Sequence, residues 1–474
     1  MIPPRLTRIV ATVGPASSDP AMLRAMIEAG ADVVRLNASH GGAAFFRDIT
    51  ALVRKISEEL DRPTAILMDL GGPKIRVGEL RGGSVELRVG TELSVEHGDF
   101  EGTAERIPCT YAAIADDVEP GDLILLDDGL LELKVRARRG GGLRCEVLEG
   151  GTLRAHKGIN VPGRAMSAPA FGAKDLRDLE CAIELDLDYI ALSFVRSAAD
   201  IVALRKAMHA RNGEIPIIAK IEKPQALDCI EDILAETDAI MVARGDLGVE
   251  IALERVPAVQ KQLIRQANLF GVPVITATQM LESMMENPRP TRAETSDVAN
   301  AIFDGTDAIM LSGETAAGKH PLEAVHMMDR IARQAESGRR PVDRSLERSR
   351  FRPGLRAMSQ AAKRIADDVD ARTIVVYTAS GTTALALSKL RARRQIVALT
   401  PDPAVRRRMS LYQGVFALQI DFHGDTDSVL RKGDELLLGL GLAEPGERVV
   451  VMGGSRQFAG ATDMVQLRRL GKDA

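Results

Sequence analysis

Eight short, continuously apolar segments recur along the sequence, each followed by a polar cluster and then a helical pattern. They span residues 8–13, 32–36, 64–69, 189–194, 216–221, 239–243, 273–276 and 308–311. Apolar runs without alternation are typical of parallel strands buried on both faces. Between them lie amphipathic segments such as 20–29, which Ser18 or Asp19 can cap and Gly30 can end. Eight strands with helical crossovers favour a (β/α)8 barrel over an open sheet.

Two further domains are expected around this barrel. Between residues 71 and 168 the pattern changes to short alternating strands at 84–89, 93–95, 123–126 and 130–136, separated by Gly and Asp turns. This indicates a small, β-barrel-like lid domain inserted into a loop at the mouth of the barrel. The barrel itself is then formed by residues 1–70 and 169–338. An Arg- and Pro-rich linker is expected at 339–356, and an α/β domain at 357–474 with strands at 373–377, 395–399, 415–420 and 448–452.

Composition excludes several classes of protein. Sixty-two basic and 66 acidic side chains give a net charge of −4, and there is no Trp, so neither a nucleic acid nor a membrane surface is an expected partner. The four cysteines form no C-x-x-C pair, which argues against a zinc site or a disulfide framework and for a reducing compartment. With no signal-peptide pattern and no run of 18 apolar residues, a cytoplasmic protein is expected.

Polar residues follow seven of the eight predicted barrel strands. Catalytic groups of such barrels lie at the carboxyl ends of several strands, and seven polar ends are hard to explain as helix caps alone. We therefore predict a functional site at this mouth. The residues are Arg35, Asn37, Ser39, His40, Asp69, Ser193, Arg196, Lys220, Glu222, Arg244, Asp246, Thr278, Gln279, Ser312 and Glu314.

Lys220 and Glu222 are two residues apart, so on one strand their side chains share a face. Asp246 after the next strand adds a second carboxylate, and two such oxygen ligands suit Mg²⁺, which keeps waters and substrate oxygens. Gly245 precedes Asp246 where a helix begins, so free N–H groups can receive an anion. The cations that can neutralise a polyphosphate are Arg35, Arg76 and Lys157. Without an activated nucleophile, this set indicates phosphoryl transfer.

Residues 313–319 match the phosphate-binding pattern G-x-x-x-x-G-K. His320 stands where that motif needs a Ser or Thr hydroxyl for Mg²⁺, and the segment follows the eighth strand of a barrel. We interpret it as a chance match.

Seven motifs, in order, resemble the pyruvate kinase family. They are TRIVATVGPAS at 7–17, VRLNASHG at 34–41, IIAKIE at 217–222, MVARGDLGVE at 241–250, ATQMLES at 277–283, PRPTRAE at 288–294 and MLSGETA at 310–316. The resemblance implies a barrel, a lid and a regulatory domain, and the reaction of phosphoenolpyruvate with ADP to give pyruvate and ATP. It also implies a homotetramer.

The resemblance also implies roles for individual residues. Glu222 and Asp246 would hold Mg²⁺ (or Mn²⁺), and Lys220 would stabilise the transferring phosphoryl group and the enolate oxygen. Arg35 would bridge the phosphoryl group. Thr278 and the Gly245–Asp246 backbone would receive the substrate carboxylate, with Thr278 on the face where the enolate is protonated. The residues matching the ADP phosphate contacts are Asn37, His40, Arg76 and Lys157, and Asp128 matches, more weakly, a lid carboxylate that meets Arg35 on closure.

One position departs from the potassium-dependent pattern of the family. Where Asp-Thr-Lys-Gly-Pro-Glu-Ile-Arg is usual, residues 69–76 read Asp-Leu-Gly-Gly-Pro-Lys-Ile-Arg, so Lys74 replaces the acidic residue. The region matching the monovalent-ion site comprises Asn37, Ser39, Asp69, Leu70 and Lys74. We expect the Lys74 ammonium to supply the missing charge, so that K⁺ is not required; the alternative is a solvated residue at the lid hinge.

The third domain carries a candidate loop for a phosphorylated allosteric effector. Thr378, Ser380, Gly381, Thr382 and Thr383 join a strand to a helix and offer hydroxyls and N–H groups. The loop resembles the family's effector-phosphate loop, although it also fits a simple capping turn. Arginines 391, 393, 394 and 406–408 fit either effector binding or a solvated face. No Trp follows in 453–460, so recognition of fructose 1,6-bisphosphate is not expected.

Two other functions fit parts of the sequence. A Mg²⁺-dependent barrel aldolase or mutase acting on a pyruvate enolate would share Lys220, Glu222 and Asp246, but it gives no reason for the lid, Arg76 or Lys157. A pseudoenzyme that senses phosphorylated metabolites would not need the intact catalytic set.

Overall fold

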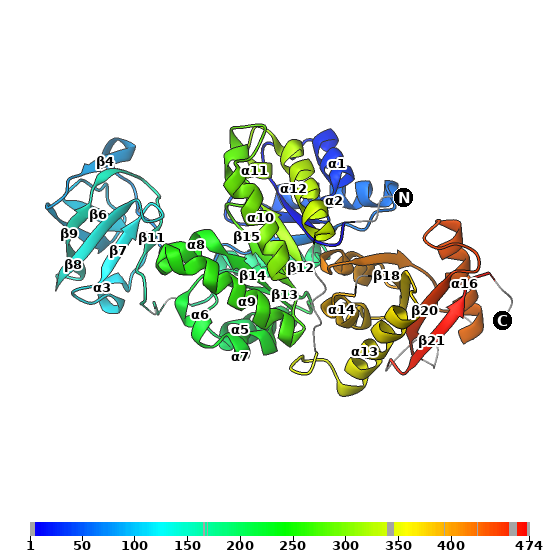
Figure 1. Cartoon of the computed structure of the whole chain (residues 1–474). Helices are drawn as coiled ribbons and strands as arrows, with labels where there is room; N and C mark the ends of the chain where they lie inside the picture. Colours follow the sequence, from blue (N-terminus) through cyan, green and yellow to red (C-terminus); the bar gives the residue numbers. More distant parts are fainter. Residues whose placement is uncertain are drawn as a thin grey trace.

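The computed structural model describes residues 5–164, 166–167, 169–338, 346–392, 394–423, 425–454 and 462–471. At its centre a closed barrel of parallel strands confirms the predicted (β/α)8 fold (Figure 1). The barrel strands are β1 (Arg8–Val13), β2 (Val33–Asn37), β3 (Ala65–Asp69), β12 (Tyr189–Leu192), β13 (Ile217–Ile221), β14 (Ala239–Ala243), β15 (Val274–Ala277) and β16 (Ala308–Leu311).

Amphipathic helices surround the barrel. The first, α1 (Pro20–Ala29), begins where Asp19 accepts hydrogen bonds from the Ala21 and Met22 N–H groups and ends at Gly30, as the capping pattern predicts. The other helices around the barrel are α2 (Ala43–Glu59), α4 (Ala173–Glu184), α5 (Ala198–His209), α7 (Ile230–Glu236), α9 (Val256–Phe270), α10 (Arg292–Asp304) and α12 (Pro321–Ser337). Short helices lie in the loops: α6 (Pro224–Asp228), α8 (Arg244–Glu250) and α11 (Gly313–Ala316). Among the described residues, no helix has the length and apolarity to cross a membrane.

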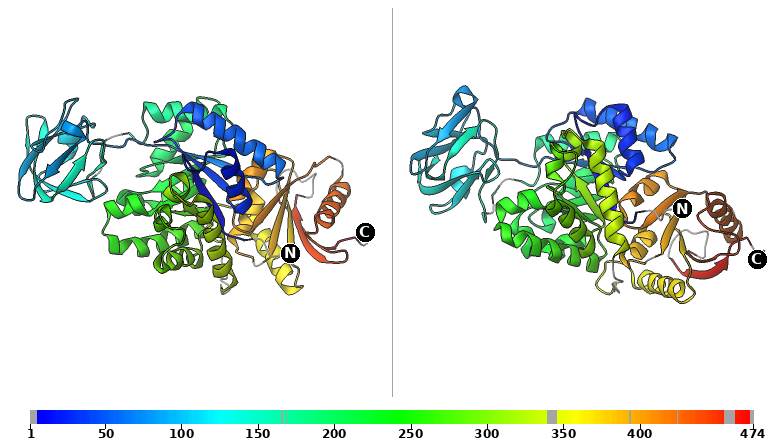
Figure 2. Two further views of the ribbon diagram at one scale, coloured as in Figure 1. Left: turned by 90° about the horizontal axis from the view of Figure 1, so that it is seen from above. Right: turned by 45° about the horizontal axis from the view of Figure 1, so that its top comes forward.

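The lid domain stands away from the mouth of the barrel and is joined to it by two chain segments (Figures 1 and 2). It holds a six-stranded sheet in the order β11-β7-β8-β9-β5-β6 and a two-stranded sheet of β10 and β4. Their bounds are β4 (Ser84–Leu87), β5 (Glu92–His97), β6 (Arg106–Cys109), β7 (Leu123–Leu126), β8 (Leu131–Arg139), β9 (Gly142–Glu149), β10 (Gly151–Arg154) and β11 (Ile159–Asn160). Its separate core includes Val95, Leu133 and Val147.

The C-terminal domain is a five-stranded sheet in the order β19-β18-β17-β20-β21. The strands are β17 (Thr373–Tyr377), β18 (Gln395–Thr400), β19 (Val415–Gln419), β20 (Arg448–Gly453) and β21 (Met464–Arg469), and only β21 runs antiparallel to its neighbour. The helices are α13 (Pro353–Asp368), α14 (Thr382–Lys389), α15 (Pro403–Arg408) and α16 (Thr426–Gly439). Within the stretch expected as a linker, Leu346 and Phe351 are buried in this domain's core; residues 339–345 lie outside the described part of the chain.

The C-terminal domain closes the end of the barrel opposite the mouth. Leu411, in the 3₁₀ turn η4 (Met409–Leu411), is fully buried and packs in one cluster with inward-facing strand residues such as Val10 and Ile218. Next to it, the Tyr189 hydroxyl donates to the Arg408 carbonyl at 2.7 Å. The barrel interior is therefore completed by a residue from another domain.

Cations of the C-terminal domain reinforce this contact. Lys389 and Arg391 bind the buried Asp307 at 2.5 and 3.0 Å, and Arg407 binds Asp188 at 2.8 Å. Arg406 binds Asp61 of the barrel at 2.7 Å. Arginines 391, 406 and 407 thus form neither a solvated face nor an open anion site. Arg394 pairs with carboxylates of its own domain, and Arg393 lies outside the described residues.

Candidate active site

Lys220 lies at the centre of the barrel mouth. It faces inward from β13, in step with Ile218, because side chains alternate along a strand. Its Nζ lies 2.8 Å from Glu222 Oε1 and 3.3 Å from Asp69 Oδ1, and it donates to Ser193 Oγ at 2.7 Å. Burial alone would lower the pKa of Lys220, but the carboxylates of Asp69, Glu222 and Asp246 outweigh it and raise that pKa. The lysine therefore remains an ammonium ion.

Asp69 joins Lys220 to Arg35. Arg35 donates from Nη2 and Nε to Asp69 Oδ2 at 2.7 and 2.9 Å, and from Nη1 to Thr12 Oγ1 at 3.0 Å. Burial would raise the pKa of Asp69, but Lys220 and Arg35 hold it below its ordinary value. One carboxylate thus fixes two cations on adjacent sides of the mouth.

Glu222 and Asp246 form the carboxylate pair expected to bind metal. Glu222 is buried; its Oε2 accepts a hydrogen bond from the Phe194 N–H at 2.8 Å, while Oε1 has no hydrogen-bond partner of good geometry among the described residues. Burial raises the pKa of Glu222, the Lys220 charge opposes that shift, and Asp246 adds to it. The described residues contain no cluster of three or more His, Cys, Asp and Glu that could hold a metal alone. Two neighbouring carboxylates, with Glu222 Oε1 contacted only by the Lys220 ammonium among the described residues, still fit Mg²⁺, which retains several waters.

Thr278 and Gly245 meet beside this pair. The Gly245 N–H donates to Thr278 Oγ1 at 2.7 Å, and the Thr278 hydroxyl donates to the Ala277 carbonyl at 2.7 Å. Gly245 lies in the first turn of α8, one residue before Asp246. A polar hydroxyl and a helix-start N–H are therefore held together next to the carboxylates.

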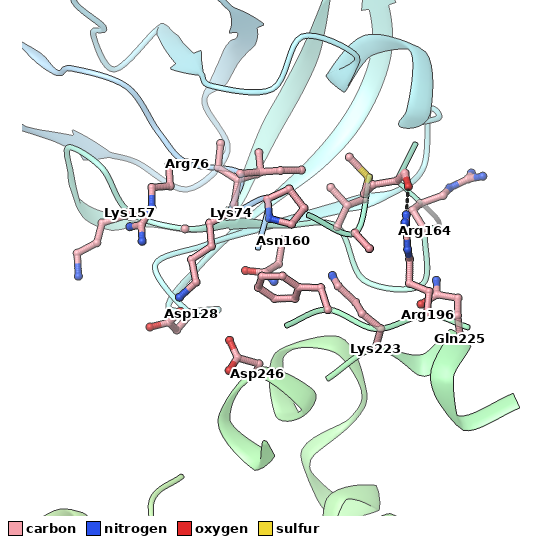
Figure 3. Close-up of a pocket in the computed structure, with 18 of the residues that line it drawn as sticks. Lys74, Arg76, Asp128, Lys157, Asn160, Arg164, Arg196, Lys223, Gln225 and Asp246 are labelled. Carbon is pink, nitrogen blue, oxygen red and sulfur yellow. Dashed lines mark hydrogen bonds between the residues drawn. The ribbon is translucent and has the colours of Figure 1, made fainter. Parts of the chain in front are cut away.

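A cavity of about 280 Å³ separates the lid from the barrel mouth. Figure 3 shows Arg76 and Lys157 along its lid side, Asp246 on its barrel side, and the Lys74 side chain extending toward Asp128. His40 also lines it; burial and the charges of Lys74, Arg76 and Arg35 lower the pKa of His40. Lysines and arginines therefore outnumber carboxylates among the residues that line the cavity, and Asp246 lies on its barrel side.

Comparison with known proteins identifies this arrangement. The family model described as Pyruvate kinase, barrel domain, matches residues 4–325, and Pyruvate kinase, alpha/beta domain, matches residues 356–467. The chain belongs to the pyruvate kinase family. It is 43% identical over 470 residues to a pyruvate kinase of Corynebacterium efficiens, covering 99% of this chain and 98% of that protein. A pyruvate kinase of Mycobacterium tuberculosis is 42% identical, with 99% of both chains covered.

A solved structure supports the same assignment. The crystal structure of a pyruvate kinase from Cryptosporidium parvum superposes with a TM-score of 0.91 at 34% identity, covering 98% of this chain and 96% of that one. Pyruvate kinases are phosphotransferases, so the chain is an enzyme of that class. The predicted family is confirmed.

Several predicted pyruvate kinase residues have partners within the protein. Lys157 pairs with Asp127 at 2.7 Å, and Arg76 donates to the His156 carbonyl at 2.8 Å. Asn37 Oδ1 accepts the Ser39 N–H at 3.0 Å, which shapes the turn after β2. Asp128, the lid carboxylate expected to meet Arg35, lines the cavity. Arg35 contacts Asp69 and Thr12, and Asp128 does not contact Arg35 in this conformation.

Two residues that follow the eighth barrel strand have structural partners instead. Glu314 is fully buried and accepts the Leu281 and Ser312 N–H groups at 3.0 and 2.7 Å, so it organises two loops. Lys319 of the chance phosphate-loop match pairs with Glu286 at the surface.

Sequence reasoning missed Thr12, although its alternation with the inward-facing Val10 on β1 was the available signal.

The candidate effector loop forms a closed turn. The Gly381 N–H donates to Thr378 Oγ1 at 3.0 Å, and Ser380 and Thr382 share a hydrogen bond of 2.9 Å between their hydroxyls. Thr383 bonds Thr462 at 2.7 Å. Gly381, at φ 79°, packs next to Met409 and Tyr412. The loop therefore lies beside the segment that closes the barrel. Residues 455–460 of the 453–460 stretch without Trp lie outside the described chain.

Proposed function

We propose that the protein catalyses Mg²⁺-dependent transfer of the phosphoryl group of phosphoenolpyruvate to ADP, which gives pyruvate and ATP. The observation that carries this proposal is the grouping of Lys220, Glu222 and Asp246 at one barrel mouth, where Asp246 lines a cavity rich in cations. Such a reaction depends on positioning and on stabilising negative charge, because its leaving group is an enolate.

Glu222 and Asp246 would hold the metal ion. When bound, Mg²⁺ (or Mn²⁺) supplies positive charge that neutralises substrate oxygens. Lys220 stabilises charge developing on the transferring phosphoryl group and on the enolate oxygen, and the carboxylates around it keep it protonated. Arg35, held by Asp69 and Thr12, donates to the phosphoryl oxygens.

Thr278, with the Gly245–Asp246 backbone, receives the substrate carboxylate. Without substrate, the Gly245 N–H donates to Thr278 Oγ1. This contact holds the two groups together at the position where the carboxylate would bind. Thr278 also lies on the face where the enolate accepts its proton. The ADP phosphates are contacted by Asn37, His40, Arg76 and Lys157. Arg76 and Lys157 approach from the lid side of the cavity, and Asn37 also orders the turn that carries His40.

The enzyme needs no K⁺ in this proposal. The Lys74 side chain lines the cavity (Figure 3) and forms no ion pair with the described residues. We infer that its ammonium replaces the ion at the region of Asn37, Ser39, Asp69 and Leu70. Activity in tetramethylammonium buffer should change little when KCl is added. Lys74→Glu should become KCl-dependent, with Lys261→Glu as a surface control; strong KCl stimulation of the unaltered enzyme would refute the proposal.

Regulation and assembly are part of the same proposal. We infer that the loop of Thr378, Ser380, Gly381, Thr382 and Thr383 binds a phosphorylated effector and that the enzyme is a homotetramer. A ligand that binds the folded state raises the melting temperature, so thermal-shift measurements with sugar phosphates and AMP test the loop. Loss of the shift in Thr382→Ala supports it, and an unchanged shift contradicts it. Light scattering gives the subunit number.

The proposed reaction is tested by formation of ATP from phosphoenolpyruvate and ADP. We expect ATP to form with Mg²⁺ and not in EDTA. Cleavage or rearrangement of a pyruvate enolate without ATP formation would instead support an aldolase or mutase, and no turnover would indicate a non-catalytic sensor.

A further inference from the structure

The turn that carries Thr278 is strained. Thr278 has φ 67° and Gln279 has φ 53°, so two consecutive non-glycine residues follow β15 in the left-handed region. A β-branched residue adopts this conformation rarely, and it persists only where surrounding contacts impose it. Thr278 Oγ1 accepts a hydrogen bond from the Gly245 N–H, so the backbone conformation of Thr278 sets the position of its hydroxyl in the proposed carboxylate site. The contacts that impose it therefore matter for catalysis.

Arg244 makes those contacts. Its Nη2 donates to the Thr278 carbonyl at 2.8 Å and lies 3.3 Å from the Gln279 carbonyl. Its Nε lies 3.3 Å from the carbonyl oxygens of Ala277 and Thr278. One guanidinium thus contacts three successive carbonyl groups across the strained turn.

Arg244 is itself fixed from the other side. Its Nη1 donates to Asp297 Oδ2 at 2.6 Å and to Gln260 Oε1 at 3.2 Å, from helices α10 and α9. The side chain is only 10% exposed. Nη1 and Nη2 each have at least two acceptors and Nε has its own, so no N–H group of this guanidinium is left to bind substrate. A planar guanidinium offers donors in fixed directions, which the single ammonium of a lysine does not reproduce.

We propose that Arg244 is a positioning residue that holds Thr278 in its left-handed conformation and thereby keeps its hydroxyl next to the Gly245 N–H. This inference rests on the proposed function, in which Thr278 and Gly245 receive the substrate carboxylate. Arg244 is the first residue of α8, which also carries Asp246, so it couples the turn after β15 to the helix bearing a metal ligand. It acts through Thr278 and does not touch the reacting atoms.

The test compares Arg244→Lys with Arg205→Lys. Arg205 offers a matched control, because it also binds a carbonyl (Glu236) and a carboxylate (Asp238), but beside the opposite end of β14. Displacement of a reacting group by about 1 Å costs up to about 100-fold in rate, so kcat of Arg244→Lys should fall about 10- to 100-fold. The KM for ADP should not change, and Arg205→Lys should retain the kcat of the unaltered enzyme.

A double-mutant cycle separates positioning from a general structural effect. If Arg244 acts through Thr278, Arg244→Lys should change kcat less than about threefold in a Thr278→Ala background. An equal loss in both backgrounds, or no loss in either, overturns the inference. Should Arg244→Lys not fold, Asp297→Asn removes the anchor while Arg244 remains, and the same cycle applies. Failure of the proposed function is distinguishable, because the unaltered enzyme would then form no ATP.

Discussion

Replacing Lys220 by methionine removes one positive charge from the barrel mouth and leaves a side chain of similar length. Among the described residues, Lys220 is the one cation paired with Glu222, while Asp69 also has Arg35. The change therefore leaves Glu222 without its paired cation and keeps the Arg35–Asp69 contact intact.

The magnitude follows from the role of the charge. Loss of one group that stabilises developing negative charge typically lowers kcat about 10²- to 10³-fold, or ~3–4 kcal/mol in the barrier. We expect at least this loss for Lys220→Met, because its ammonium is buried against three carboxylates and no other described cation reaches Glu222. Binding of phosphoenolpyruvate should persist, since Arg35, Thr278 and the two carboxylates proposed to bind the metal remain.

The assay couples ATP formation to a chromogenic reaction and measures phosphoenolpyruvate binding by calorimetry. Lys261→Met serves as the control, because this lysine pairs with Asp304 on the surface, away from the mouth. Turnover of Lys220→Met within about tenfold of the unaltered enzyme would contradict the reasoning, since the expected loss is at least 10²-fold.

Three further results are expected. Leu411→Ala should lower the free energy of unfolding in urea by about 2–5 kcal/mol, because it empties the closed end of the barrel; a change near zero would show that the plug is not needed. Burial raises the pKa of Asp307, but Arg391 chiefly outweighs it and holds the pKa below the ordinary value. The Asp307 carboxylate thus contributes fully to stability above about pH 4, and this contribution is lost as the pH falls through the lower pKa of the folded state. Asp307→Asn should therefore weaken the dependence of the free energy of unfolding in urea on acid pH. An unchanged dependence on pH would contradict this. NMR titration should give His40 a pKa below its ordinary value, because of burial and the Lys74 charge. Lys74→Met should raise that pKa. An unchanged pKa would show that the Lys74 ammonium does not lie near His40.

The barrel was predictable because its strands are buried on both faces. Segments such as 239–243 and 308–311 are continuously apolar, and such short apolar runs are typical of a parallel sheet covered on both sides. Strand β21 (Met464–Arg469) was not predicted, because it is an edge strand with mostly half-exposed or exposed residues and lacks a buried face. The closure of the barrel by Leu411 was equally hidden, since nothing local marks a leucine that packs in another domain.

The candidate site also has a part that could be predicted from the sequence and a part that could not. The spacing of Lys220 and Glu222 predicted that they share a face, because strand periodicity is local. Two other contacts depend on which strands become neighbours in the barrel. They are the ion pair of Arg35 with Asp69 and the hydrogen bonds of Arg244 to the turn after β15. The sequence places Arg244 at a strand end, but the positive φ of Thr278, which gives that arginine its role, is not visible in the sequence.

Metal binding tests the central claim most directly. Titration of the protein with Mn²⁺, followed by electron paramagnetic resonance of the free ion, counts the sites without requiring turnover. We predict one site in the unaltered chain that is lost or greatly weakened in Asp246→Asn and in Glu222→Gln, and kept in Glu254→Gln. Unchanged Mn²⁺ binding in both carboxylate variants would contradict the account.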